Sequence, residues 1–512
     1  MKRFFVFLFL LCFLAGLNLT MAAQTETIPV GDEVYSWVYD FIDQLYLRGY
    51  LREIHLGSKP YYRGEVASLI LSLDEKKIRF DPVELWLIQE LKKEFSSEIE
   101  NLKKDGEDGK ELKFGLDFLE KAQIQKAKRS DLLERGLPFL GAQFSKNFSL
   151  FLRYDINESL AKDPTYEGKV WKGFAGEAEQ AYFAFKFPYF KLILGRDRLS
   201  WGQSKISSLI LSDESPHLDM IKIQGGWGFF QGTAFTAFLE PMAVEGKIIK
   251  RYLSGHRLSF KIYPWAELGL SETIIYGGED RGLEPYYLNP LLWYHGAQLN
   301  HNRDDNTFLS FDFNLSPKEN ILFYGEFLID DFQIEKSSPS DKEPDELGFI
   351  LGFSLADFFG LSGSEFNLEY DRIANRTYNQ QNEWNRYLHK KRLLGSRLGP
   401  DSDCFKTSIR GWIKKGLEMK IGYSFSRHGE GSIFSFWDQP WLFDPDYKEK
   451  FPTGVVEKTK DFSFGLGYRY NSHLKANLTF GYTKVSNKEN ITEDDEDFFK
   501  LTINFQYQFI KR

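Results

Sequence analysis

The C-terminal stretch Lys500-Leu501-Thr502-Ile503-Asn504-Phe505-Gln506-Tyr507-Gln508-Phe509 decides the fold class. Apolar side chains occupy every second position in it, and polar or charged side chains occupy the positions between them. Because successive side chains of a β-strand point to opposite faces of a sheet, this pattern predicts a strand with one wholly apolar face and one wholly polar face.

Other segments of the second half of the chain repeat the alternation. They are residues 309–315, 347–355, 417–425, 462–470 and 474–482. The pattern predicts a large antiparallel β structure, but a soluble β-sandwich would alternate in the same way. The alternation by itself therefore leaves sandwich and barrel open.

The lengths of the connections distinguish the two architectures. Short turns are expected near residues 471–473, 414–416, 360–362, 316–319, 264–265, 225–226, 188–189 and 145–147. Long loops are expected near residues 488–496, 430–458, 376–403, 333–345, 278–306, 242–250, 202–216, 157–177 and 121–136. Regular alternation of short and long connections is typical of outer-membrane barrels, which have short periplasmic turns and long extracellular loops.

These connections predict a transmembrane antiparallel β-barrel of about eighteen strands over residues 111–512, with residues 111–119 in the first strand. An even number of strands places both ends of the barrel on the periplasmic side. The apolar face must then meet lipid, because a closed sheet in a bilayer satisfies its backbone polar groups internally.

The N-terminus predicts export to the outer membrane of a Gram-negative-type envelope. Lys2 and Arg3 precede an apolar run, and Ala22-Ala23 offers a small-residue cleavage site, as in a cleaved signal peptide spanning residues 1–23. Cys12 follows Leu11, where a lipid-attachment motif has a small residue, which disfavours a lipoprotein. Cleavage would leave Cys404 as the single cysteine, so no intramolecular disulfide is expected.

Composition agrees with an outer-membrane barrel. After the signal peptide no apolar stretch approaches the roughly 18 residues that a membrane helix needs, and the mean hydropathy is −0.39. Phe, Tyr and Trp make up 17% of the chain, with 48 Phe and 26 Tyr beside 42 Gly, which suits strands with an aromatic outer face. Loss of the signal peptide would take the net charge from −8 to −10, and a balance of that sign disfavours nucleic acid as a partner.

Residues 24–110 have a helical rather than an alternating period. An apolar stripe from Val34 to Leu45 stops near Gly49, and Asp81-Pro82 followed by Glu84 is a capping-box start. A shorter helix is expected around residues 63–73, and residues 103–110 have the charge and glycine content of a linker. We expect this segment to be a packing module that plugs the periplasmic end of the barrel.

The densest motif is Gly195-Arg196-Asp197-Arg198-Leu199-Ser200-Trp201-Gly202, followed by Ser207-Ser208-Leu209-Ile210-Leu211-Ser212. It resembles the capsule assembly protein Wzi family, whose members carry a Gly-Arg, then a Trp-Gly, and then a Ser-Leu-Ile-Leu-Ser stretch. Three further segments are similar to that family: Val30-Gly31-Asp32 with residues 59–63, residues 324–332 including Glu326 and Asp330, and residues 394–403.

The resemblance implies an eighteen-strand outer-membrane barrel with an N-terminal α-helical bundle on the periplasmic side. It also implies a non-enzymatic surface lectin that assists attachment or assembly of capsular polysaccharide. The implied partners are that polysaccharide, outer-membrane lipids and the barrel-insertion machinery. One departure is that Ile510-Lys511-Arg512 follow Phe509, whereas a terminal aromatic residue is usual in the signal that the insertion machinery recognises.

Arg196 and Arg198 are two residues apart and follow Leu192 and Leu194 on the same face, where a charge in lipid is costly. Either the strand leaves the membrane there, or Gly195 forms a bulge that turns the arginines inward. One hypothesis pairs the arginines with lumen carboxylates such as Glu326 or Asp330. The other has the guanidinium groups recognise acidic sugars.

Three predicted loops combine aromatic and polar side chains, as sugar binding requires. The candidate polysaccharide-binding residues are Trp293, Tyr294 and Asn300 in the first loop, Trp384 in the second, and Trp437, Asp438, Trp441 and Tyr447 in the third. The third loop is the strongest candidate because its aromatic residues lie far from both flanking strands. Interfacial aromatic belts and loop packing would explain the same residues.

The sequence offers little for catalysis. The eight histidines are scattered, and neither a His-x-x-x-His motif nor a cysteine cluster predicts a metal site or a cofactor. Two rival functions remain open. An outer-membrane diffusion channel would use Lys420, Arg469, Lys475 and Lys500 on the polar face of the strands, and an envelope hydrolase would need one of the loop histidines. The identity of the glycan is left open by the sequence.

Overall fold

The computed structural model describes residues 25–75, 78–103, 111–125, 131–145, 147–332, 343–444, 446–471 and 473–511. The predicted signal peptide, residues 1–23, and residues 104–110 of the predicted linker lie outside the described residues. In the part of the chain that is described, none of the helices combines the length and apolarity needed to cross a bilayer.

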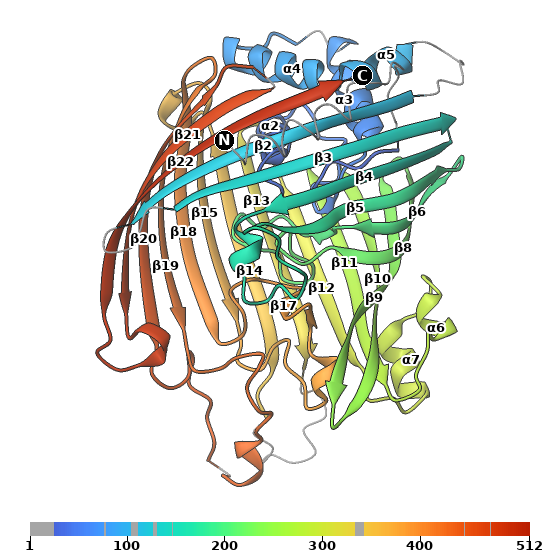
Figure 1. Ribbon diagram of the computed structural model, residues 1–512, viewed down its shortest axis with the longest axis vertical. Helices are drawn as coiled ribbons and strands as arrows, with labels where there is room; N and C mark the ends of the chain where they lie inside the picture. Colours follow the sequence, from blue (N-terminus) through green and yellow to red (C-terminus); the bar gives the residue numbers. More distant parts are fainter. Residues whose placement is uncertain are drawn as a thin grey trace.

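The body of the protein is a closed antiparallel barrel of eighteen strands (Figure 1). The barrel strands are β2 (Glu111–Gln125), β3 (Asp131–Ser145), β4 (Phe148–Asn157), β5 (Ala175–Lys186), β6 (Phe190–Asp197), β8 (Leu218–Trp227), β9 (Phe230–Val244), β10 (Lys247–Tyr263), β11 (Ala266–Gly278), β12 (Asn306–Leu315), β13 (Ile321–Asp331), β14 (Glu346–Ala356), β15 (Ser364–Ile373), β18 (Ser402–Lys414), β19 (Leu417–His428), β20 (Glu457–Arg469), β21 (Leu474–Ser486) and β22 (Glu496–Lys511). The first strand pairs with both β3 and β22, which closes the sheet. The predicted strand number and the predicted first strand are confirmed.

The wall of the barrel has its polarity reversed relative to a soluble protein. In β22, Ile503, Phe505 and Tyr507 are more than two-fifths exposed on the outside, whereas Gln506 and Gln508 are buried on the inside. The two glutamine amides donate to the carbonyl of Val34 and the hydroxyl of Tyr35, at 3.2 and 3.1 Å. The apolar face that the sequence predicts is therefore the outer face, as in barrels that sit in lipid.

Three predicted connections differ from the structure. The predicted long loop at 242–250 is a tight hairpin turn, because β9 and β10 remain paired up to Val244 and Lys247. Glu245 and Gly246 both have positive φ there, as two-residue hairpins require. The predicted loop at 121–136 shortens to the interval between Gln125 and Asp131, and the turn predicted at 225–226 lies instead at 228–229.

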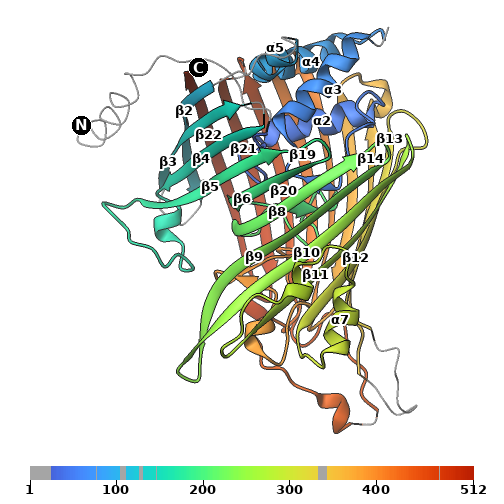
Figure 2. The same ribbon diagram turned by 90° about the vertical axis from the view of Figure 1, so that its right-hand side faces the viewer.

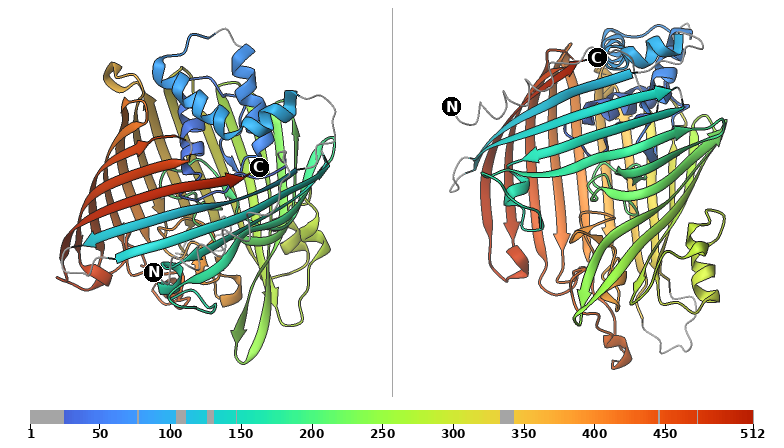
Figure 3. Two further views of the ribbon diagram at one scale, coloured as in Figure 1. Left: turned by 45° about the horizontal axis from the view of Figure 1, so that its top comes forward. Right: turned by 45° about the vertical axis from the view of Figure 1, so that its right-hand side comes forward.

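Within its described residues, the N-terminal segment forms four helices at the end of the barrel where the short turns and the C-terminus lie (Figures 1 and 3). This is the periplasmic end in outer-membrane barrels. They are α2 (Ser36–Leu47), α3 (Arg63–Glu75), α4 (Pro82–Glu94) and α5 (Ser96–Lys103). The sequence predicts the first three. The capping box at Asp81 is confirmed, since its carboxylate accepts from the backbone of Val83 and Glu84 at 2.7 and 2.8 Å.

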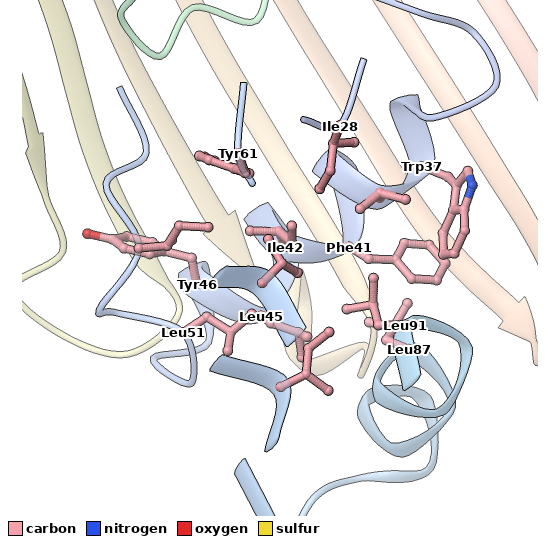
Figure 4. Close-up of a cluster of buried hydrophobic side chains, with 14 of the residues drawn as sticks. Ile28, Trp37, Phe41, Ile42, Leu45, Tyr46, Leu51, Tyr61, Leu87 and Leu91 are labelled. Carbon is pink, nitrogen blue, oxygen red and sulfur yellow. The ribbon is translucent and has the colours of Figure 1, made fainter. Parts of the chain in front are cut away.

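The apolar stripe of α2 packs into a core shared with the barrel (Figure 4). Trp37, Phe41, Ile42 and Leu45 are buried among residues of α3 and α4. The same core includes inward-facing residues of the wall, namely Leu119, Leu137, Leu322, Tyr324 and Ala356. Trp412 of β18 packs edge-on against Phe41 and Trp86, with centroids 5.7 and 4.7 Å apart. Helix α2 thus lies inside the mouth of the barrel, and α4 and α5 lie over the opening (Figures 1 and 2).

Buried ion pairs fix this segment in place. Arg153 of β4 lies between Asp32 of the N-terminal segment and Asp117 of β2, at 3.2 and 3.1 Å. Within the helices, Arg63 donates to Glu94 at 2.9 Å and to Glu98 at 2.6 Å, and all three side chains are almost fully buried. Burial opposes ionisation of Arg63, but the two carboxylates raise its pKa.

We predict that Arg63→Leu lowers the protection free energy of α3 to α5 by about 3–5 kcal/mol, because it leaves two buried carboxylates without their cation. Hydrogen exchange of the helical amides measures this effect. Lys92→Leu is the matched control, since its ion pair with Asp74 is largely exposed and should contribute about 1 kcal/mol or less. Equal protection in the two variants would contradict the prediction.

Candidate functional site

Two loops at the opposite, extracellular end fold inward and fill the lumen there. They are the β6–β8 loop (residues 198–217), which contains β7 (Ser200–Trp201), and the β15–β18 loop (residues 374–401), which contains β16 (Leu388–His389) and β17 (Arg392–Leu393). Their buried apolar side chains form one cluster with inward-facing residues of the wall: Trp201, Leu209, Ile210, Leu211, Tyr378, Tyr387 and Leu394 from the loops, with Phe235, Leu253, Ile275, Phe308, Leu328 and Ile350 from the strands. We call this set the inward-loop cluster.

The two inward loops are held to each other by hydrogen bonds. The hydroxyls of Tyr378 and Tyr387 donate to the carbonyls of Leu209 and Ile210, at 2.6 and 2.8 Å. The amide of Ser212 donates to the carbonyl of Leu394 at 3.0 Å. The Ser-Leu-Ile-Leu-Ser motif and the 394–403 motif of the sequence therefore form a single contact.

Carboxylates of the wall accept from the backbone of these loops. Glu326 of β13 accepts from the amide of Leu209 at 2.8 Å, and Asp330 accepts from the amide of Tyr378 at 2.5 Å. Glu369 of β15 accepts from Lys205 and Ile206, both at 2.7 Å. Buried backbone N–H groups need such partners, so these carboxylates fix where the loops enter the lumen.

The β6–β8 loop also joins the N-terminal segment. Strand β7 pairs with β1 (Ser58–Lys59), and the amide of Gly202 donates to the carbonyl of Gly57 at 3.0 Å. One nitrogen of Arg198, Nη1, donates to the carbonyls of Val30 and Asp213, at 3.1 and 3.0 Å. Three motifs of the sequence therefore meet at the contact between the loop and the N-terminal segment: residues 195–202, residues 30–32 and residues 59–63.

The structure corrects the expected pairing of Arg196 and Arg198. The register of β6 with β5 and β8 runs without a shift through Gly195, so there is no bulge, and the strand ends at Asp197. Arg196 stays on the outward face and pairs with Asp219, at 2.8 and 2.5 Å. Neither arginine contacts Glu326 or Asp330, because those carboxylates are used by the loop backbone.

A cavity of about 450 Å³ opens at the rim where these arginines lie, and we call it the arginine cavity. Its lining combines cations, carboxylates and aromatic rings: Arg196, Arg198, Lys390, Arg392, Glu167, Glu177, Glu240, Tyr154, Tyr166 and His217. The residues come from four strands and from three loops, including the β4–β5 loop, residues 158–174. The sequence predicted the two arginines but could not place Lys390 and Arg392 beside them.

Several charges of the arginine cavity are paired, whereas Arg198 is not paired within the described part of the chain. Lys390 lies 3.4 Å from Glu177, and Arg392 contacts Asp163. Burial opposes ionisation of Asp163, but bonds from Thr165 and Arg392 lower its pKa. Among the described residues no carboxylate forms an ion pair with Arg198, whose Nε has no hydrogen-bond partner and whose pKa is lowered by burial. Burial, followed by the nearby arginines, also lowers the pKa of His217, which is therefore neutral at pH 7.

A second rim cavity of about 460 Å³ lies around Trp384, and we call it the Trp384 cavity. It is lined by the β11–β12 loop, residues 279–305, and by the β15–β18 loop. Arg281, Asp304 and Asn382 are among its polar residues. Asn382 donates to Asp304 at 2.5 Å, which joins the two loops across the cavity.

The other predicted sugar-binding residues are not gathered at one place. Tyr294 and Trp441 are buried, so their rings are not free to stack on a sugar. Trp441 lies against Arg376 and Tyr447, and Asp438 pairs with Arg376 at 3.0 Å. Trp437 is half-buried, while Trp293 and Asn300 are exposed near the short helix α7 (Tyr294–Asn300). Of these candidates, Trp384 lines one of the two rim cavities described above.

The residues that the structure describes contain no group of three or more His, Cys, Asp and Glu side chains that could hold a metal ion. Cys404 is buried, and burial disfavours its thiolate.

A closed barrel with an apolar exterior, a lumen filled from both ends and polar cavities at its extracellular rim defines an outer-membrane β-barrel protein. The family model for capsule assembly protein Wzi matches residues 137–499. The chain therefore belongs to the capsule assembly protein Wzi family, as its motifs predict.

Comparison with a solved structure agrees with the fold. The structure of Wzi of Escherichia coli, described as an outer membrane protein involved in group 1 capsule assembly and a carbohydrate-binding β-barrel, aligns over 94% of this chain and 99% of its own, with 16% identity and a TM-score of 0.63. OccD3 (OpdP) of Pseudomonas aeruginosa covers 78% of this chain and 92% of its own at 10% identity, with a TM-score of 0.47. OccK1 (OpdK) of the same organism covers 78% and 99% at 10% identity, with a TM-score of 0.46. No curated protein matches the chain.

We predict that Gly202→Ala releases the β6–β8 loop from the lumen. Gly202 has a φ of +106°, and an added Cβ would lie 2.1 Å from the Glu326 carboxylate. Because that carboxylate is held by the amide of Leu209, we expect the loop to shift together with the Glu326 side chain. Hydrogen exchange in residues 203–215 should accelerate at least about tenfold, equivalent to roughly 1.4 kcal/mol.

Gly246→Ala is the matched control for that variant. Gly246 also has positive φ, at +80°, but an added Cβ would meet no atom within 4 Å. It tests backbone strain without a collision. If both variants leave the exchange of residues 203–215 unchanged, the close approach of Gly202 to Glu326 does not hold the β6–β8 loop in the lumen, and the prediction is wrong.

Proposed function

We propose that the protein is a non-enzymatic surface lectin of the outer membrane that binds capsular or related surface polysaccharide and assists its attachment. The observation that carries this proposal is the arginine cavity, which offers aromatic rings, cations and carboxylates together at the extracellular rim. Family membership supports the capsule, and the carbohydrate binding described for the Escherichia coli protein supports the ligand class.

The chemistry of the arginine cavity suits an acidic sugar. Tyr154 is 46% exposed, so its ring can stack on the apolar face of a sugar. Guanidinium groups recognise carboxylate or phosphate substituents with two parallel hydrogen bonds. Arg198, which has no carboxylate partner among the described residues, is the side chain most able to take such a substituent. The carboxylates of Glu167, Glu177 and Glu240 can accept from hydroxyls.

The contents of the lumen favour a lectin over a diffusion channel. Arg469, one of the charged residues expected to line a channel, lies with its guanidinium 4.1 Å from the ring centroid of Trp37. Lys475 lines a space of only about 10 Å³ with it, about the volume needed for one water molecule. We therefore propose that residues 24–110 act as a plug, that residues 111–512 are the barrel, and that residues 1–23 are a cleaved signal peptide.

Substitution of the cavity cations should weaken glycan binding. Arg392→Gln and Lys390→Gln are each expected to raise the Kd for an acidic surface polysaccharide of the producing cell about tenfold, because a hydrogen bond to a charged group contributes about 1.5–3 kcal/mol. Titration calorimetry with the purified polysaccharide measures the change. Trp384→Ala tests the second rim cavity in the same assay.

Arg397→Gln is the control for these variants. Arg397 lies in the same loop and pairs with Glu214, but it is about half exposed and does not line the arginine cavity. Its Kd should equal that of the unmodified protein. Unchanged binding by Arg392→Gln, Lys390→Gln and Trp384→Ala together would rule out both rim cavities as the glycan site.

In planar bilayers the intact protein should give no steady openings, because the N-terminal helices and the inward loops occupy the two ends of the lumen. A variant that lacks residues 25–103 and has residues 203–215 replaced by a short Gly-Ser linker should conduct. The variant with only residues 488–494 replaced serves as control and should stay silent. Steady large openings by the intact protein would favour the channel instead.

A further inference from the structure

The β11–β12 loop lies against the outside of the barrel (Figures 1 and 2). It contains α6 (Pro285–Leu288) and α7. On β11, Ser271 and Thr273 face the lumen, where they contact Arg257 and Tyr387. Glu272, between them, therefore faces outward, and it accepts from the amides of Tyr294 and His295 at 2.8 and 2.9 Å. The first turn of α7 thus rests on the outer surface of the wall.

The two short helices cover a patch of this wall. Tyr252, Ile274 and Tyr276 of the outward face form a buried cluster with Tyr287 and Tyr294 of the helices. The ring centroids of Tyr276 and Tyr287 are 4.8 Å apart. His256 lies 3.2 Å from Glu272 under the same cover. The two short helices therefore shield the polar side chains of this patch from lipid and water outside the barrel.

The depth of the patch explains why it needs cover. A tilted strand crosses the apolar layer in about 9–11 residues, so β11, which starts at Ala266 at the periplasmic turn, remains in that layer to about residue 275. Glu272 falls within this span, above the outward-facing Leu268 and Leu270. A carboxylate at that depth cannot face acyl chains cheaply. The helices take the place of lipid there and satisfy the carboxylate with backbone N–H groups.

The outer side of the helices is itself apolar. Leu288, Leu291, Trp293 and Leu299 are 46%, 92%, 48% and 65% exposed. Residues 285–300 contain no Asp, Glu, Lys or Arg, and charged residues return directly on either side at Glu284 and Arg303. Tryptophan concentrates at membrane interfaces, and an apolar face with leucine and tryptophan is the side that an interfacial helix buries in the lipid.

We propose that residues 285–300 form an interfacial anchor that inserts into the outer leaflet of the membrane, with the acyl chains of outer-leaflet lipid as its partner. Leu268 and Leu270 of the wall face lipid, and the exposed apolar side chains of the anchor extend this lipid-facing surface toward the rim. The anchor is separate from glycan binding. It assigns Trp293, a candidate for sugar stacking by sequence, to lipid.

The anchor has a further consequence for the rim. The lining of the Trp384 cavity includes residues 277–282, 284 and 302–304, which flank residues 285–300 on both sides. An anchor held in the leaflet therefore keeps this cavity at the level of the membrane surface. A polymer bound at the Trp384 cavity would lie along the lipid headgroups rather than above them.

Spin-label accessibility tests the depth of the anchor. In a Cys404→Ala background of the full protein, a nitroxide is attached to Leu291→Cys or Leu299→Cys, and the protein is reconstituted into phosphatidylcholine–phosphatidylglycerol vesicles. Collision rates with oxygen and with a water-soluble nickel chelate are then compared. Leu268→Cys on the lipid-facing wall and Glu245→Cys at the tip of the β9–β10 hairpin are the apolar and aqueous controls.

We expect the labels at 291 and 299 to resemble the label at 268, with nickel collision at least fivefold lower than at 245. Nickel collision equal to that at 245 would overturn the anchor. Spin–spin broadening at 291 that disappears on dilution with unlabelled protein would mean that a second copy covers these leucines, and would also overturn it. Glycan binding is measured separately, so a result that overturns the proposed lectin function would not change the outcome of this test.

Discussion

The requirement that every backbone N–H and C=O in a bilayer find a partner within the protein governs this structure. Pairing of β2 with β22 closes the sheet and leaves no unpaired edge. Closure then divides each strand between two surroundings, lipid outside and packed protein inside. Side chains of the wall such as Phe505 meet the lipid directly. Its inward-facing side chains are packed only where other parts of the chain enter the lumen.

The interior is built from pieces that arrive from opposite ends. Helices α2 to α5 bring an apolar core and buried charges from one end, and the two inward loops bring the inward-loop cluster from the other. They meet at the β1–β7 pair and at Arg198. Several motifs by which the sequence resembles the family lie at this meeting point. Their residues hold the interior together, and the rim cavities are formed near them.

The strands could be predicted from the sequence because alternation is a local property that each strand carries in its own residues. The side-chain partners could not. Arg196 pairs with Asp219 across a strand pair, and Trp441 is covered by Arg376 from another loop, and no spacing in the sequence encodes either contact. Glu272 looks like a charge on a lipid-facing strand until α7 is placed over it. Trp384 was predicted because an aromatic ring among polar loop residues is itself a signal, whereas Lys390 and Arg392 carried none.

Arg198 takes part in two structures at once, the contact with the N-terminal segment and the arginine cavity. Its Nη1 donates to Val30 of the N-terminal segment, and the same side chain lines the arginine cavity at the cell-surface rim. A ligand that takes Nη1 of this guanidinium competes for it with the carbonyl of Val30. Such a ligand weakens the retention of the N-terminal segment. By thermodynamic reciprocity, the segment then weakens the binding of the ligand by the same free energy. The single side chain of Arg198 thereby links the cell-surface rim to the N-terminal segment.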